Sequence, residues 1–201
     1  MSRPALDVSE LPEYAFGSRD PMFWGLTGML AIESTMIALL VGGYFYLRGK
    51  FDLWPPSPVG VTAGALGAVE LALLLASCLP TLWLTRAAQQ LDLRRARRFL
   101  WILTLLGAVV VALRVFEFRA LGFRWDSNAY GSMVWAMLGI HALHVGVGVG
   151  ENAVFLALML RGPIEKKFMV DVYVNGLYWY FVVAGWVVLY ATVYLEPVLG
   201  S

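Results

Sequence analysis

Five long apolar stretches constrain this chain more than any other feature of its sequence. A helix needs about 20 apolar residues to cross about 30 Å of hydrocarbon, and each stretch is long enough. We place them at residues 21–47, 59–84, 99–118, 129–160 and 172–196. In hydrocarbon only helices and closed barrels satisfy every backbone polar group, and stretches of this length suit helices. The sequence therefore predicts an all-α, polytopic membrane protein with five transmembrane helices.

Composition supports a membrane location. Of the 201 residues, 60% are hydrophobic and 14% charged, and the mean hydropathy is +0.70. A soluble domain has a much larger charged fraction. The net charge of +1 favours neither nucleic acid nor an acidic partner. Residues 1–20 lack the basic start and apolar core of a signal peptide. We therefore expect them to form a cytoplasmic N-terminal segment, followed by a single transmembrane domain over residues 21–198.

Positive charge is distributed unevenly between the two sides. Cytoplasmic loops of membrane proteins carry an excess of Lys and Arg. The richer side holds Arg3, Arg19, Arg86, Arg94, Arg95, Arg97, Arg98, Arg161, Lys166 and Lys167. The other side holds Arg48, Lys50, Arg119 and Arg124. This asymmetry predicts that the N-terminus lies inside and the C-terminus outside. We interpret the clusters as topology determinants, with protein or lipid binding as the alternative.

Several ionisable residues fall inside the predicted spans, where a charge costs a few kcal/mol or more. They are Glu33, Glu70, Arg114, Glu117, His141, His144 and Glu151. Counted along their helices, Glu33, Glu70, His141 and His144 lie roughly 17 to 22 Å deep. We therefore predict a buried network in which Glu33 or Glu70 is hydrogen-bonded to the histidines. Glu151 is expected on the same helix face as the histidines.

Arg114 and Glu117 are three residues apart near the outer end of the third span, a spacing that predicts an ion pair. Metal binding has weaker support, because His141 and His144 lie on one helix and cannot ligate a haem iron from both sides. A carboxylate dimetal site would need ligand pairs on other helices. Cys78 is the one cysteine. We therefore expect no cofactor or metal to be bound by this chain.

Aromatic side chains crowd the last span at Tyr178, Trp179, Tyr180 and Trp186. Taken alone, they are typical of interfacial anchors and helix packing. Small residues recur at a spacing of four and predict close approach of helices: Gly60 with Gly64 on the second span, and Gly146 with Gly150 on the fourth.

Two of these segments resemble motifs of subunit III of the haem-copper (cytochrome c) oxidases. Tyr130-Gly131-Ser132 and Gly139-Ile140-His141-Ala142-Leu143-His144-Val145 resemble the family's Tyr-Gly-Ser and Thr-Gly-X-His-Gly-X-His-Val patterns. Tyr178-Trp179-Tyr180-Phe181-Val182 resembles its Tyr-Trp-His-Phe-Val-Asp motif. Glu33-Ser34 falls where the family places a buried glutamate. The resemblance covers about residues 23–194, and the five helices match the short bacterial form of the subunit.

The resemblance implies an accessory, non-redox subunit of a respiratory terminal oxidase in the inner membrane of a bacterium. Such a subunit packs directly on subunit I, in one complex with subunit II. It stabilises the catalytic subunit, binds phospholipid and supports proton uptake. Haem and copper are then expected in the partner subunits.

Four positions depart from the family pattern: Tyr180 replaces a His, Val183 an Asp, Glu70 an Asn and Arg114 a Gln. These changes indicate a rewired polar network in which Arg114 compensates an added carboxylate. Other functions also remain open from the sequence. One is a subunit-III-like protein associated with a nitric oxide reductase, and another is an independent proton or ion conductor. The third is a membrane enzyme with its own metal.

Overall fold

The computed structural model describes residues 15–56, 60–162 and 165–199. Its elements are η1 (Gly17–Arg19), α1 (Pro21–Arg48), α2 (Val61–Gln89), α3 (Leu93–Ala120), α4 (Ala129–Arg161), α5 (Phe168–Tyr190), the π-helical turn η2 (Ala191–Leu195) and α6 (Glu196–Leu199). Within these ranges there is no strand, and five helices are long and apolar enough to cross a membrane. The predicted fold class is confirmed. Most of the expected N-terminal segment lies outside the described residues.

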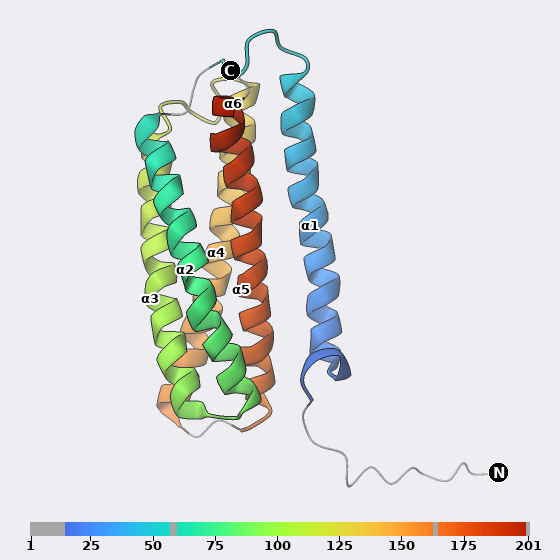
Figure 1. Cartoon of the computed structure of the whole chain (residues 1–201), viewed down its shortest axis with the longest axis vertical. Helices are drawn as coiled ribbons and strands as arrows, with labels where there is room; N and C mark the ends of the chain where they lie inside the picture. The colour runs from blue at the N-terminus through green and yellow to red at the C-terminus, as the bar shows by residue number, and fades with distance from the viewer. Residues whose placement is uncertain (1–14, 57–59, 163–164, 200–201) are drawn as a thin grey trace, which may run out of the picture.

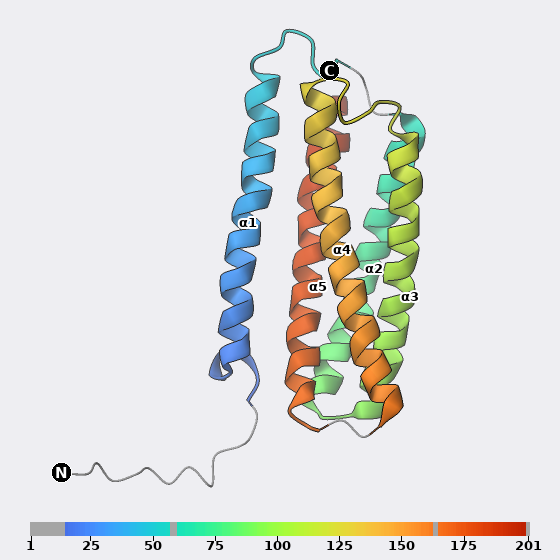
Figure 2. The same cartoon turned by 180° about the vertical axis from the view of Figure 1, so that it is seen from behind.

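Four of the helices form a bundle, and the first lies beside it. α2 packs against α3 and α5, α4 packs against α3 and α5, and α1 packs against α4 and α5. Figures 1 and 2 show α1 standing to one side of the other four helices along its whole length. Contacts between α1 and the bundle therefore determine whether the first helix stays attached.

Capping residues explain where the helices begin. Asp20 accepts a hydrogen bond from the Met22 amide at 2.6 Å, and Pro21 occupies the first turn of α1. Asn128 accepts one from the Gly131 amide at 2.7 Å at the start of α4. Each cap pairs a backbone donor that the helix cannot pair itself.

The third helix is longer than the predicted span, and the arginines before that span are in the helix and not in a loop as expected. α3 begins at Leu93, so residues 94–98 form its first turns. Asp92 caps this earlier start by accepting from the Arg95 amide at 3.0 Å. The turn from α2 spans only residues 90–92. Long arginine side chains can extend to water from a helix that continues through the membrane interface, so charge marked the end of the apolar region and not of the helix.

The predicted close approach is confirmed at Gly60, where a Cβ atom would lie 2.7 Å from the Ala120 carbonyl oxygen at the end of α3. At Gly64 a Cβ would make an ordinary contact with Tyr194 at 3.6 Å.

A Cβ atom on Gly146 or Gly150 would meet nothing within 4 Å, so the expected close approach at these positions was wrong. A Cβ on Gly148 would lie 2.9 Å from the Trp179 ring, and one on Gly107 would lie 2.3 Å from Val149. The face of α4 that packs on the bundle is therefore the one that carries Gly148.

Candidate functional site

His144 connects α4 to α1 near the middle of the molecule. Its Nε2 lies 3.1 Å from Glu33 Oε2, and the two side chains are 12% and 29% exposed. The ring also packs edge-on against Phe181 of α5, with centroids 5.9 Å apart. The Tyr178 hydroxyl donates to the His144 carbonyl at 3.3 Å. Three helices therefore meet around this pair.

Arg114 lies at the centre of a second polar group inside the four-helix bundle. Its Nη2 is 2.5 Å from Glu70 Oε2 on α2, and its Nη1 forms an ion pair with Glu117 one turn further along α3. Arg114 is 3% exposed and both carboxylates are fully buried. The guanidinium also stacks over the Trp186 ring, 3.8 Å from its centroid. One cation therefore holds α2, α3 and α5 together.

His141 joins the Arg114 group and has both ring nitrogens engaged. Nδ1 lies 3.1 Å from Arg114 Nη2, and Nε2 lies 3.1 Å from the Val182 carbonyl oxygen. A guanidinium only donates and a carbonyl only accepts. Hence Nε2 carries the hydrogen and Nδ1 accepts, which makes His141 a neutral imidazole. Its nitrogens are occupied by these two contacts.

Tyr194 completes this group from the far end of the last helix. Its hydroxyl donates to Glu117 Oε1 at 2.5 Å. Tyr194 lies in the π-helical turn η2, a local widening of the helix that is often found at functional sites. Tyr194 was not predicted as a site residue, because tyrosines near a span end are usually interfacial anchors.

The expected single network is thus divided into two groups. His141 and His144 are three residues apart, so their side chains differ by about 60° around α4. That rotation directs His141 into the bundle and His144 toward α1. Arg114 and Glu117 were expected as a separate outer pair, but they are joined to Glu70 and His141. An arginine side chain is long enough to reach groups at another depth, and Arg114 contacts both Glu70 and His141.

Glu151 belongs to neither group. Its side chain is exposed, and within the described ranges it makes no hydrogen bond or ion pair. It lies instead on the wall of a cleft. The seven residues from His144 to Glu151 are two helical turns, about 10 Å along the axis, so a shared helix face did not bring these side chains together.

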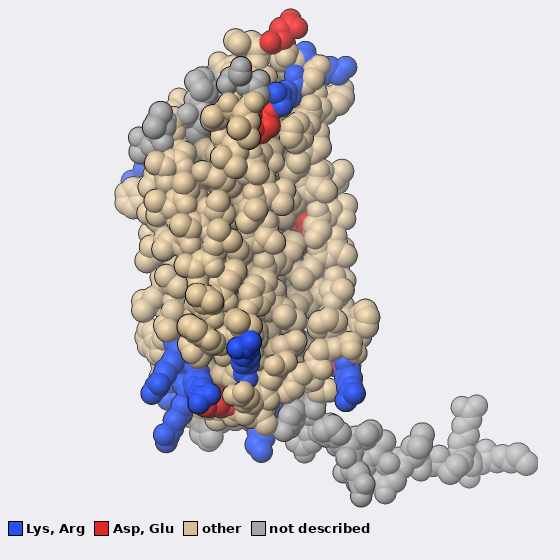
Figure 3. Space-filling model, viewed as in Figure 1, with Lys and Arg blue, Asp and Glu red and all other residues tan. Residues whose placement is uncertain are grey.

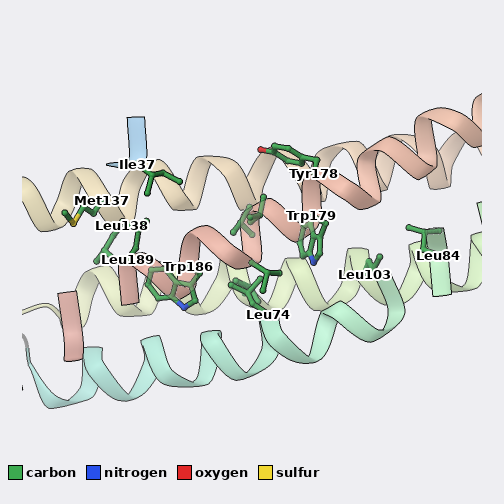
Figure 4. Packing of buried hydrophobic residues seen from close by; sticks show 14 of the residues in the cluster. Ile37, Leu74, Leu84, Leu103, Met137, Leu138, Tyr178, Trp179, Trp186 and Leu189 are labelled. Atoms are coloured by element: carbon green, nitrogen blue, oxygen red, sulfur yellow. The ribbon is translucent and has the colours of Figure 1, made fainter. Parts of the chain in front are cut away.

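The aromatic residues of the last span tie α5 to its neighbours. The Trp179 indole donates to Ser77 Oγ at 2.8 Å, and the Trp186 indole donates to the Gly67 carbonyl at 3.4 Å. The Tyr180 hydroxyl donates to the Cys78 carbonyl at 3.4 Å. Figure 4 shows Trp179 and Trp186 pointing into the bundle, whereas Tyr178 points away from them. The two tryptophans are therefore core residues.

A cleft of about 570 Å³ opens between α1 and the α4–α5 pair. It lies toward the start of α1, below the Glu33–His144 pair as Figure 1 is drawn. Most of its lining is apolar, and Gly25 and Gly150 widen it because they lack side chains. Glu151 and Asp171 line its polar part. An apolar cleft with a polar end has the character of a site for an amphipathic molecule.

Two further polar contacts were not predicted from the sequence. At the end of α1, Tyr44 donates to Glu196 at 2.8 Å, and Arg48 forms an ion pair with the same carboxylate. Asn175 of α5 donates to Asn152 of α4 at 3.0 Å, with both residues buried. The two asparagines could have been predicted from the sequence, because a polar amide inside an apolar span needs a hydrogen-bond partner. Glu196 gave a weaker signal because it lies at a span end.

No group of three or more His, Cys, Asp and Glu side chains could hold a metal ion in the part of the chain that is described. Within each of the two groups, polar side chains from different helices contact one another. This arrangement can join helices and keep buried charges paired.

Comparison with known proteins gives a consistent result. The family model for cytochrome c oxidase subunit III matches residues 23–197. Cytochrome c oxidase subunit 3 of Thermostichus vulcanus is 28% identical over 175 residues, covering 85% of each chain. A probable cytochrome c oxidase subunit 3 of Nocardia farcinica is 32% identical over 172 residues, covering 82% of this chain and 83% of the relative. The subunit of Xenopus laevis is 28% identical, over 83% of this chain and 67% of its own. The chain therefore belongs to the cytochrome c oxidase subunit III family.

Proposed function

We propose that this chain is the accessory, non-redox subunit of a bacterial terminal oxidase and packs directly on catalytic subunit I, in a complex that includes subunit II. This proposal rests on the observation that the buried ionisable side chains of the bundle are paired with one another. Glu70, Glu117 and His141 each contact Arg114 inside the bundle. Groups engaged in this way hold helices together, which supports a stabilising role, with haem and copper in the partner subunits.

Removal of the subunit tests the accessory role. In a strain that lacks this chain, the remaining oxidase should keep its haem spectrum and its initial turnover rate. It should then lose activity faster during sustained turnover, since the proposed role is to stabilise the catalytic subunit and support proton uptake. Loss of the haem spectrum, or an initial rate near zero in an assembled complex, would contradict the proposal.

We propose that the cleft between α1 and the α4–α5 pair holds a phospholipid. Its walls are largely apolar, and the paired Glu33 and His144 lie about one helical turn beyond Met29 and Val147 of its lining. Gly150 lines the cleft and has free space around it. Gly150→Leu should therefore fill the cleft without a clash and reduce the phospholipid retained by the purified complex.

Gly146→Leu is the matched control for this test. Gly146 lies one turn earlier on α4, also has free space around it, and does not line the cleft. The control should retain the wild-type amount of lipid, measured by mass spectrometry of extracted phospholipid per complex. Equal retention by Gly150→Leu and the wild type would contradict the lipid site.

We propose that the N-terminus lies in the cytoplasm and that the whole transmembrane part is a single domain. Figure 3 shows Lys and Arg side chains gathered at the end of the molecule where α2 meets α3. Positive charge resists translocation, so this end should be cytoplasmic. In a Cys78→Ser background, a cysteine at Gln90 should react with an impermeant thiol reagent only from the inside. One at Asp52 should react only from the outside, and the reverse pattern would overturn the orientation.

A further inference from the structure

A second pocket lies at the turn between α2 and α3, away from the cleft and from both polar groups. It has a volume of about 480 Å³ and is lined by Trp83, Arg86, Ala87, Gln90, Arg95 and Phe99. The rings of Trp83 and Phe99 lie 5.5 Å apart, one from each helix. The pocket thus combines two guanidinium groups and an amide with two aromatic rings.

The polarity of the surface changes with distance from the turn. Side chains three or four residues apart share a helix face. In order away from the turn, the residues on these faces are Gln90, Arg86, Trp83 and Leu79 on α2, and Arg95, Phe99 and Ile102 on α3. Leu79 is 57% exposed and Ile102 is 43% exposed. The polar pocket therefore continues into an apolar face at the depth where acyl chains lie.

The two arginines are available to a ligand. Arg86 is exposed, and no carboxylate of the described residues forms an ion pair with it. Arg95 contacts Asp92 through Nε at 3.2 Å, and its side chain is 64% exposed, so its terminal nitrogens can make other contacts. Asp92 lies in the same turn and accepts a hydrogen bond from the Arg95 amide as the cap of α3.

We propose that this pocket binds the headgroup of an anionic phospholipid. The phosphate would be held by Arg86 and Arg95, because a planar guanidinium donates two parallel hydrogen bonds to phosphate oxygens. Trp83 and Phe99 would pack against the glycerol region, as aromatic rings do at the membrane interface. An acidic protein segment would use the arginines but would leave the apolar face without a role. This site is separate from the cleft, so either can fail without the other.

The test measures lipid binding to the full chain in mild detergent by native mass spectrometry. The probes are phosphatidylglycerol and phosphatidylcholine with identical acyl chains, and inorganic phosphate as competitor. The wild type should bind one phosphatidylglycerol in preference to phosphatidylcholine. Arg86→Gln and Arg95→Gln should each weaken that binding about fivefold, the amount expected for one basic residue at an anionic lipid surface. These side chains are exposed, so folding should be unaffected.

Arg94→Gln is the matched control, since Arg94 is exposed on the same turn of α3 and does not line the pocket. It should change the affinity by less than a factor of about two. A loss in Arg94→Gln equal to that in Arg86→Gln would mean diffuse attraction and would overturn the site. Equal affinity for the two lipids would also overturn it. Binding of inorganic phosphate as tight as that of the lipid would overturn the lipid assignment, and so would an unchanged lipid affinity in Arg86→Gln.

Discussion

Replacing Arg114 with methionine removes the cation that lies between Glu70 and Glu117. Both carboxylates are fully buried, and they would then face each other inside the bundle without it. Removing one partner of a buried ion pair costs about 3–5 kcal/mol. The stacking of the guanidinium over Trp186 adds about 0.5–2 kcal/mol. Because the lost contacts share one residue, we expect a total destabilisation of about 4 kcal/mol.

The assay is reversible unfolding of the purified chain in mixed micelles, followed by circular dichroism as the fraction of denaturing detergent rises. Arg119→Met is the control, because Arg119 is exposed at the end of the same helix and should change stability by less than about 0.5 kcal/mol. The triple variant Arg114→Met, Glu70→Gln, Glu117→Gln should recover most of the loss, since no unpaired carboxylate remains. A single variant within about 1 kcal/mol of the wild type, or a triple variant as unstable as the single, would refute this reasoning.

Two further perturbations test other contacts. Glu33→Gln should be mild because an amide still hydrogen-bonds His144, whereas Glu33→Ala should cost about 1–3 kcal/mol and release the subunit more readily from the complex in detergent. Loss of turnover in Glu33→Gln with the subunit still bound would instead indicate a direct role in proton delivery. Gly107→Ala would place a Cβ 2.3 Å from Val149 and should cost about 1–3 kcal/mol in the same unfolding assay. Gly146→Ala, which meets no neighbour, should be neutral or slightly stabilising.

The membrane spans could be predicted because their signal is local. A helix in hydrocarbon must be apolar over about 20 residues, and that requirement is visible without knowing which helices are neighbours. The helix ends were less predictable. Arg94 and Arg95 marked the limit of the apolar region, but the α3 helix starts earlier, at the cap supplied by Asp92.

The partners of the polar residues could not be predicted, because they depend on the order of helices in space. Depth along the axis predicted one level for Glu33, Glu70, His141 and His144. It could not show that α1 lies beside the bundle, which is why Glu33 meets His144 and does not join the Arg114 group. Depth along the axis also gives only the position of the Arg114 backbone, whereas the side chain extends far enough to reach Glu70.

The most direct test of the central claim is an optical spectrum of this chain before and after it is separated from its partners. The chain should be purified from native membranes in mild detergent with an affinity tag, and the subunits should then be dissociated. We expect haem absorbance to co-purify with the tagged chain and to stay entirely with the catalytic subunit after separation. Visible absorbance retained by the separated chain, or purification with no haem-bearing partner, would contradict the assignment as an accessory subunit.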